Sequence, residues 1–173
     1  VKETGTVTLA SGDSTIQSSG SVVVGSGASS QSDAGSVTVA AGIGHGVEGA
    51  SVAIKSGDST LVGGTGGELL LTSGSGSAGG GLRLTSGRGE TLSGGDLTVA
   101  AGEGGVHGGN LRLTSGESPG SSGSVVVVTA DGFESGDLQF ATGQAKGAQA
   151  GSIFMQAGFS SGEGVQGAAA AIT

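Results

Sequence analysis

One short pattern recurs along this chain of 173 residues: a glycine, a small or acidic residue, and then two apolar residues separated by a single variable one. The stretches GSVTVAAG (35–42) and GDLTVAAG (95–102) are two of twelve copies. Two copies are imperfect: the fourth has Ala50 in place of the glycine, and the pair of the twelfth is only Ala. The apolar pairs are Val7/Leu9, Val22/Val24, Val37/Val39, Val52/Ile54, Leu69/Leu71, Leu82/Leu84, Leu97/Val99, Leu111/Leu113, Val125/Val127, Leu138/Phe140, Ile153/Met155 and Ala169/Ala171. First members of successive pairs lie 13 to 17 residues apart. Repetition at a fixed period predicts a stack of similar units.

Each copy alternates apolar and variable residues, which is typical of a short β-strand with one buried face. Two residues after each pair comes a third position on the same face, and only small residues occupy it. These residues are Ser11, Ser26, Ala41, Ser56, Ser73, Ser86, Ala101, Ser115, Thr129, Thr142, Ala157 and Thr173. A large side chain would not fit where the chain curves inward, and the glycines that follow supply the positive φ of tight corners.

Similar strands at nearly constant spacing predict an all-β fold, a parallel β-solenoid (β-helix) of about twelve short strands. Because most segments between strands offer no consistent apolar partner, we expect two repeats of about 15 residues per coil, so that one apolar pair faces another. Residues 1–173 would form one Gly-rich repeat domain. An antiparallel meander with long glycine loops is the alternative architecture.

The composition limits the classes of function. Glycine supplies 41 residues, there are four Phe, and Trp and Tyr are absent, so a core would be thin. A mean hydropathy of +0.17 argues against disorder. The net charge of −8 disfavours binding to nucleic acid, and no apolar run is long enough for membrane insertion. The start at Val1 is typical of a mature product or of a fragment from a longer array.

The Gly/Ser-rich copies, such as GSVVVGSG, resemble the β-solenoid repeats of long extracellular fibres, appendages and cell-surface proteins. The resemblance covers the whole chain and implies an extracellular or cell-surface location and a mechanical role. A similarity to Ca²⁺-binding RTX repeats is weaker, because GGDLTV lacks their spacing.

No residue pattern indicates catalytic, cofactor-binding or metal-binding chemistry. His45 and His107 follow similar strands at different offsets, which is typical of solvated loop histidines. The acidic residues are scattered, and the glycine runs lack the G-K-[ST] ending of a phosphate-binding loop. The many Ser and Thr residues between strands are candidates for O-glycosylation.

These observations favour a non-enzymatic structural module of an extracellular filament or surface layer, which self-associates or binds neighbouring fibre subunits or glycans. Assembly would use open strand edges and an apolar outward column formed by Leu70, Val126, Val128 and Phe154. These side chains could instead be isolated, or covered by a loop carrying Phe133 or Phe159. An ice-binding β-solenoid and a carbohydrate-binding or carbohydrate-active β-helix are the alternative functions.

Overall fold

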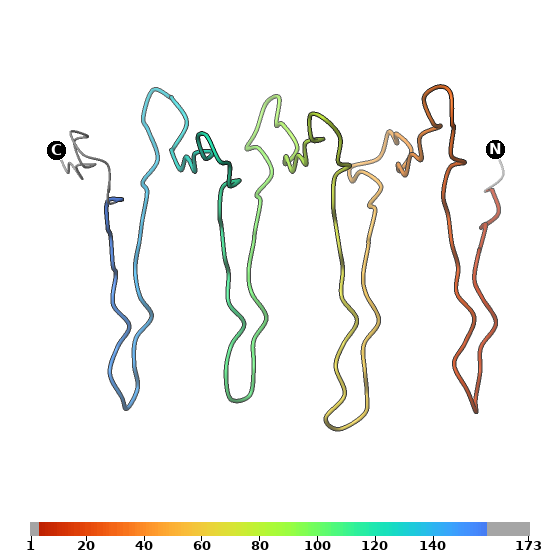
Figure 1. The fold of residues 1–173 in the computed structure, drawn as a ribbon, viewed down its shortest axis with the longest axis horizontal. Helices are drawn as coiled ribbons and strands as arrows, with labels where there is room; N and C mark the ends of the chain where they lie inside the picture. The colour runs from red at the N-terminus through yellow and green to blue at the C-terminus, as the bar shows by residue number, and fades with distance from the viewer. Residues whose placement is uncertain (1–3, 159–173) are drawn as a thin grey trace. The chain divides into compact units, whose positions relative to one another are not determined.

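A computed structural model of the chain describes residues 4–158, and in that range it contains neither an α-helix nor a β-strand. The backbone runs as extended stretches joined by bends (Figure 1). The predicted all-β solenoid is therefore wrong for the described residues, and so are the coil of two repeats and the alternative meander. The β-helix assignment fails for the same reason: no ladder of backbone hydrogen bonds joins the extended stretches of residues 4–158.

The chain divides into two units, Val1–Leu84 and Thr85–Thr173. Each described unit contains several copies of the repeat. In both units we call the stretch from the opening glycine to the third small residue of a copy a pair segment. The residues between two pair segments form a linker. The single domain 1–173 stays a prediction.

Bends recur at nearly the same interval as the repeat, and each falls in a linker. They lie at residues 15–17, 30–32, 45–48, 61–63, 76–78, 90–92, 105–107, 119–120, 133–134 and 146–148. Side-chain hydroxyls support some of them: Ser14 Oγ accepts a hydrogen bond from the Gln17 amide (3.0 Å), and Ser29 Oγ accepts one from the Ser32 amide (3.2 Å). The linkers are thus the places where the chain changes direction, as their glycine and serine content predicts.

Positive φ contributes less to these bends than the glycine content predicts. Within residues 4–158, Gly63 is the single residue with a positive φ, at 80°. It lies in the one hydrogen-bonded tight turn of the linkers, where the Gly64 amide donates to the Leu61 carbonyl oxygen at 2.9 Å. The other described bends are open and need no left-handed residue.

No side chain in residues 4–158 is buried, so the predicted inward-facing apolar pairs do not form a core. The solvent-accessible surface is 17666 Å². A compact protein of this mass exposes about 7,400 Å² and its extended chain about 23,000 Å². The chain thus keeps most of the surface of an extended polypeptide.

The physical reason for this outcome lies in the spacing of the apolar residues. Each repeat of about 15 residues brings one apolar pair, with almost no aromatic side chains to add buried area. Ordering the intervening glycines costs more conformational entropy per residue than ordering any other residue type. The apolar pairs alone therefore do not hold the extended stretches together as a sheet.

Candidate interaction surface

The alternation within the pair segments persists as a local pattern of side-chain exposure. In the copy around residue 23, Val22 and Val24 are 50% and 69% exposed, whereas Val23 between them is 90% exposed. The copy around Phe154 repeats the pattern, because Phe154 is more exposed than Ile153 and Met155. The two members of a pair thus share the less exposed side of the segment.

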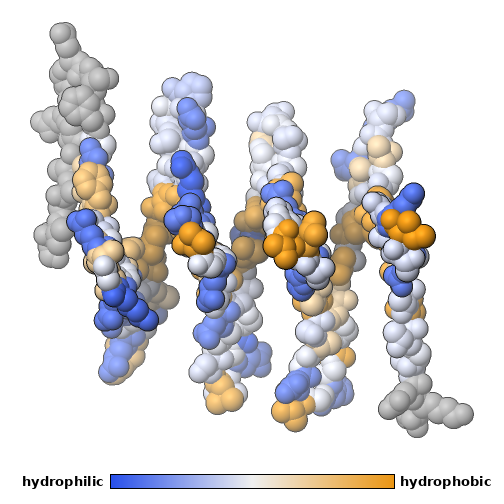
Figure 2. Space-filling view, turned by 90° about the horizontal axis from the view of Figure 1, so that it is seen from below, coloured by the Kyte–Doolittle hydropathy of each residue, from blue (hydrophilic) through white to orange (hydrophobic). Residues whose placement is uncertain are grey.

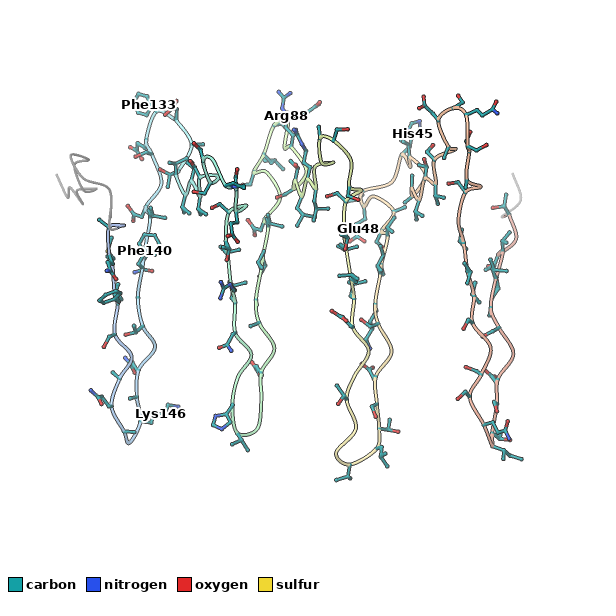
Figure 3. All side chains as sticks on the ribbon, viewed as in Figure 1. His45, Glu48, Arg88, Phe133, Phe140 and Lys146 are labelled. Atoms are coloured by element: carbon teal, nitrogen blue, oxygen red, sulfur yellow. The ribbon has the colours of Figure 1, made fainter. Side chains whose placement is uncertain are left out.

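Apolar side chains are distributed along the molecule and do not gather in an interior. Figure 2 shows apolar patches on the visible surface of successive stretches, separated by polar ones. Figure 3 shows Phe140 on an extended stretch, and Phe133 and Lys146 at changes of chain direction. The pairs therefore form a recurring, solvent-accessible apolar surface with polar linkers between them.

The third small residue of a pair segment lies next to the opening glycine of the following segment. We call this contact a neck. A Cβ atom placed on Gly109 would lie 3.4 Å from the Cβ of Ala101, and one placed on Gly20 would lie 3.5 Å from the Cβ of Ser11. The nine necks are Ser11–Gly20, Ser26–Gly35, Ser56–Gly67, Ser73–Gly80, Ser86–Gly95, Ala101–Gly109, Ser115–Gly123, Thr129–Gly136 and Thr142–Gly151. At each neck, a Cβ atom on the glycine would therefore be in van der Waals contact with the small residue of the preceding segment.

A backbone hydrogen bond closes five of the necks. In each, the opening glycine donates its amide to the carbonyl oxygen of the glycine that follows the small residue. The bonds are Gly67 to Gly57, Gly80 to Gly74, Gly95 to Gly87 and Gly109 to Gly102, each at 2.9 Å, and Gly123 to Gly116 at 3.0 Å. Linkers of different length and sequence thus end in the same closed geometry.

Six of residues 4–158 are partly exposed and the rest are exposed. Four of the six are neck serines, Ser11, Ser56, Ser86 and Ser115; the other two are Gly89 and Ala157. The expectation that the third position has no room for a large side chain stays a prediction, because these contacts describe the space beside the opening glycine. The contact between the third small residue and the opening glycine of the next segment was not predicted. The sequence did contain a signal for it, because small residues recur at both positions in nearly every copy.

The polar groups do not converge on a reactive centre in the described part of the chain. His45 and His107 are both exposed, and no three His, Asp or Glu side chains of residues 4–158 come together as a metal site. Lys55 and Asp58 form an ion pair with 2.6 Å between Nζ and Oδ2, and both side chains are about three-quarters exposed. Arg112 donates from Nε to Thr114 Oγ1 at 3.2 Å. These contacts are local, since each joins residues two or three positions apart.

No cavity or pocket is present in the described structure. Between residues 4 and 158 no helix is long and apolar enough to cross a bilayer.

The four residues of the predicted outward column are all strongly exposed. Leu70 belongs to the first unit, and Val126, Val128 and Phe154 belong to the second. No strand stacking brings them into one continuous strip in the described chain, so the column stays a prediction. The pair Ala169/Ala171, together with Thr173 and Phe159, lies outside the described residues.

No protein-family model, curated protein or solved structure matches this chain. Three features of the chain bear on its function: the apolar pairs, the necks between them, and the net charge of −8.

Proposed function

We propose that this chain is a structural, non-enzymatic repeat module of an extracellular filament or surface layer, and that it associates with further copies of itself through its apolar pairs. One observation carries the proposal: every copy of the repeat contains an apolar pair, yet no described pair is buried within the chain. Exposed apolar surface on this scale is typical of contacts with a partner.

A second copy of the chain is the partner best suited to this surface. Every chain carries apolar pairs at the same spacing, so two aligned chains can bring many pairs together at once. Once the first pairs meet, the remaining pairs act at a high effective concentration, and weak contacts add up to strong binding. Gly/Ser-rich linkers allow small adjustments of spacing between pairs.

The net charge of −8 sets the conditions under which copies associate. Like charge on every copy opposes association and keeps the chain soluble at low salt. This repulsion is long-range and screened by ions, whereas the contact of apolar pairs is short-range. Charge therefore regulates an association that apolar contacts drive.

Further contacts would come from Leu70 in the first unit and from Val126, Val128 and Phe154 in the second. They project from the variable side of the pair segments or lie directly beside it, and each is about three-quarters exposed or more. Their side chains extend the apolar surface to the opposite side of the segment. A second copy could bind on this side while another copy binds to the pairs, as a filament subunit with neighbours on two sides requires.

The ice-binding β-solenoid and the carbohydrate-binding or carbohydrate-active β-helix both required a β-solenoid, and residues 4–158 do not form one. Assembly through open strand edges required strands and is set aside for the same reason. O-glycosylation of the exposed linkers remains a proposal that is compatible with an extracellular location.

Sedimentation velocity over a wide concentration range, combined with electron microscopy of native material, tests the proposal. We expect the average mass to rise continuously with concentration and the native material to contain filaments or sheets. A chain that remains monomeric at millimolar concentration and physiological salt, with isolated particles in the native material, would contradict it.

A further inference from the structure

The bond between Asp131 and Gly132 is chemically distinct from every other bond that follows an aspartate. The chain contains six Asp residues, at positions 13, 33, 58, 96, 131 and 137. Their following residues are Ser14, Ala34, Ser59, Leu97, Gly132 and Leu138. Asp131 alone is followed by glycine, which has no side chain to shield its backbone nitrogen and which adopts the widest range of φ and ψ.

The linker that contains this bond is one of several described linkers that no neck hydrogen bond closes. In five other linkers the residue after the third small position is a glycine whose carbonyl accepts the neck hydrogen bond. Here that position is Ala130, and the glycine comes two residues later. A Cβ atom placed on the opening Gly136 would meet Thr129 only at 3.9 Å. The neck of this linker is thus the widest of the nine.

The backbone around Asp131 is exposed and unrestrained in the described structure. Among the hydrogen bonds found in residues 4–158, none involves Asp131 or Gly132. A Cβ atom placed on Gly132 would lie 2.8 Å from the Glu134 carbonyl oxygen, so the bend in its present form admits only glycine. Exposure, missing hydrogen bonds and a glycine next to a bend all ease rotation of the Asp131 side chain towards the next amide.

We propose that Asp131–Gly132 is a site of spontaneous isomerisation to isoaspartate. The Gly132 nitrogen attacks Cγ of the protonated Asp131 carboxyl group, forming an N–Cγ bond. The hydroxyl of that carboxyl and the amide proton leave together as one water molecule, which gives a five-membered succinimide. Water then adds to the ring: cleavage of N–Cγ restores aspartate, and cleavage of the bond between the nitrogen and the main-chain carbonyl carbon gives isoaspartate. One water is lost and one is gained, so the mass does not change and no other reactant is needed.

The product alters the linker between the pairs Val125/Val127 and Leu138/Phe140. The main chain now runs through the former side chain and gains one carbon atom, and the free carboxylate is attached directly to Cα. The fully exposed Phe133 lies two residues away, so its position relative to the following pair changes. Isomerisation is thus a slow, enzyme-independent change at one defined linker.

Storage of the purified chain at neutral pH and body temperature for several weeks tests this proposal. Peptide mapping with electron-based fragmentation distinguishes isoaspartate from aspartate, and methylation by an isoaspartyl methyltransferase gives an independent reading. We expect isoaspartate at position 131 to accumulate roughly tenfold faster than at any of the other five Asp residues, because only this one precedes a glycine. Asp131→Glu keeps the charge but forms the larger ring far more slowly, so it should abolish the signal. Equal amounts at all six sites would overturn the proposal.

A matched variant separates the contribution of the open linker from that of the glycine. Ser59→Gly places a glycine after Asp58, in a linker closed by the Gly67–Gly57 hydrogen bond, and Asp58 is held by Lys55. We expect Asp58 in this variant to isomerise several-fold more slowly than Asp131 in the same chain. Equal rates at the two sites would overturn the role given to the open, unrestrained linker.

Discussion

The pair segments are regular in sequence but are not hydrogen-bonded to one another, whereas the linkers are irregular in sequence but contain the backbone hydrogen bonds of the described chain. Pair segments repeat the same alternation with few exceptions, yet no backbone hydrogen bond joins one to another along its length within residues 4–158. Linkers vary in length and sequence, yet they take part in all six backbone hydrogen bonds of the described chain. Five of these bonds join the two ends of a linker at a neck, and the sixth, from Gly64 to Leu61, lies within a linker. A regular side-chain pattern can therefore occur in a segment whose backbone is not held by hydrogen bonds to a neighbouring segment.

The difference has a physical origin. A neck hydrogen bond joins residues 6 to 10 positions apart, so the chain loses little entropy when it closes. A ladder between pair segments would have to order two whole segments and the linker between them before any apolar contact formed. The pair segments therefore remain available to a partner, and the linkers set the distance between them.

Replacing members of the apolar pairs should have the largest effect, because these pairs are the feature proposed to drive association. In the triple variant Val22→Ser, Val37→Ser and Val52→Ser, each lost contact costs about 1 kcal/mol, which weakens association about a hundredfold. Sedimentation velocity measures the shift in association midpoint.

The control for this triple variant removes three apolar residues from linkers instead: Ile16→Ser, Val47→Ser and Val62→Ser. These side chains are almost fully exposed and do not recur in register. The control should associate like the unmodified chain. Equal weakening in both variants would mean that the pair segments have no special role.

The outward column gives the next largest expected effect. Phe154→Ser should weaken association about tenfold, because a large apolar contact is lost on the variable side of the segment. Val126→Ser should also weaken association, but less than Phe154→Ser does. Phe133→Ser, in a linker bend, is the matched control and should be silent. If Phe154→Ser and Val126→Ser leave association unchanged, the column is not an interface.

Salt should change association by several-fold and in a direction that identifies the driving force. Because every copy has a net charge of −8, copies repel one another at low salt. Raising the ionic strength to physiological values screens this repulsion, so association should strengthen. Light scattering across a salt series measures this change. Weakening on addition of salt would show that opposite charges drive the contact, and would remove apolar pairs from that role.

Neck glycines should have the smallest and most local effect. Gly109→Val places a side chain where a Cβ already meets the Gly102 amide nitrogen at 3.3 Å, so the hydrogen bond at this neck should be lost, at a cost of about 1 kcal/mol. Gly105→Val, in the same linker, meets nothing within 4 Å and should leave the neck intact. Amide chemical shifts and exchange rates of the linker residues report on both. Identical spectra for the neck in the two variants would contradict its assigned geometry.

Part of this arrangement could be predicted from the sequence. The alternation indicated that the two members of a pair share one side of a segment, and Val22 is indeed less exposed than the central Val23. The predicted burial of the pairs is wrong for residues 4–158. The solenoid could not be inferred in the same way, because a period of two residues tells which side chains share a face of one segment. It does not tell whether a second segment hydrogen-bonds beside it, and that depends on buried area, which the isolated pairs do not supply.

The candidate surface was also only partly predictable. The apolar residues Leu70, Val126, Val128 and Phe154 could be identified as exposed from their place between or beside pair members. The neck contacts required knowledge of how a linker closes, because Ser56 and Gly67 are separated by ten intervening residues of variable sequence. The open linker at Asp131 became visible only against its five closed counterparts.

Amide hydrogen exchange of the dilute, monomeric chain tests the central claim most directly. Because no backbone hydrogen bond joins the pair segments of residues 4–158, we expect their amides, for example those of Leu111 and Val125, to exchange at rates close to those of an unstructured chain. We expect slower exchange at the neck amides of Gly67, Gly80, Gly95, Gly109 and Gly123, which donate the closing hydrogen bonds. Strong protection that alternates along the pair segments, with none at these five glycines, would indicate a hydrogen-bonded sheet within the monomer and would contradict the account.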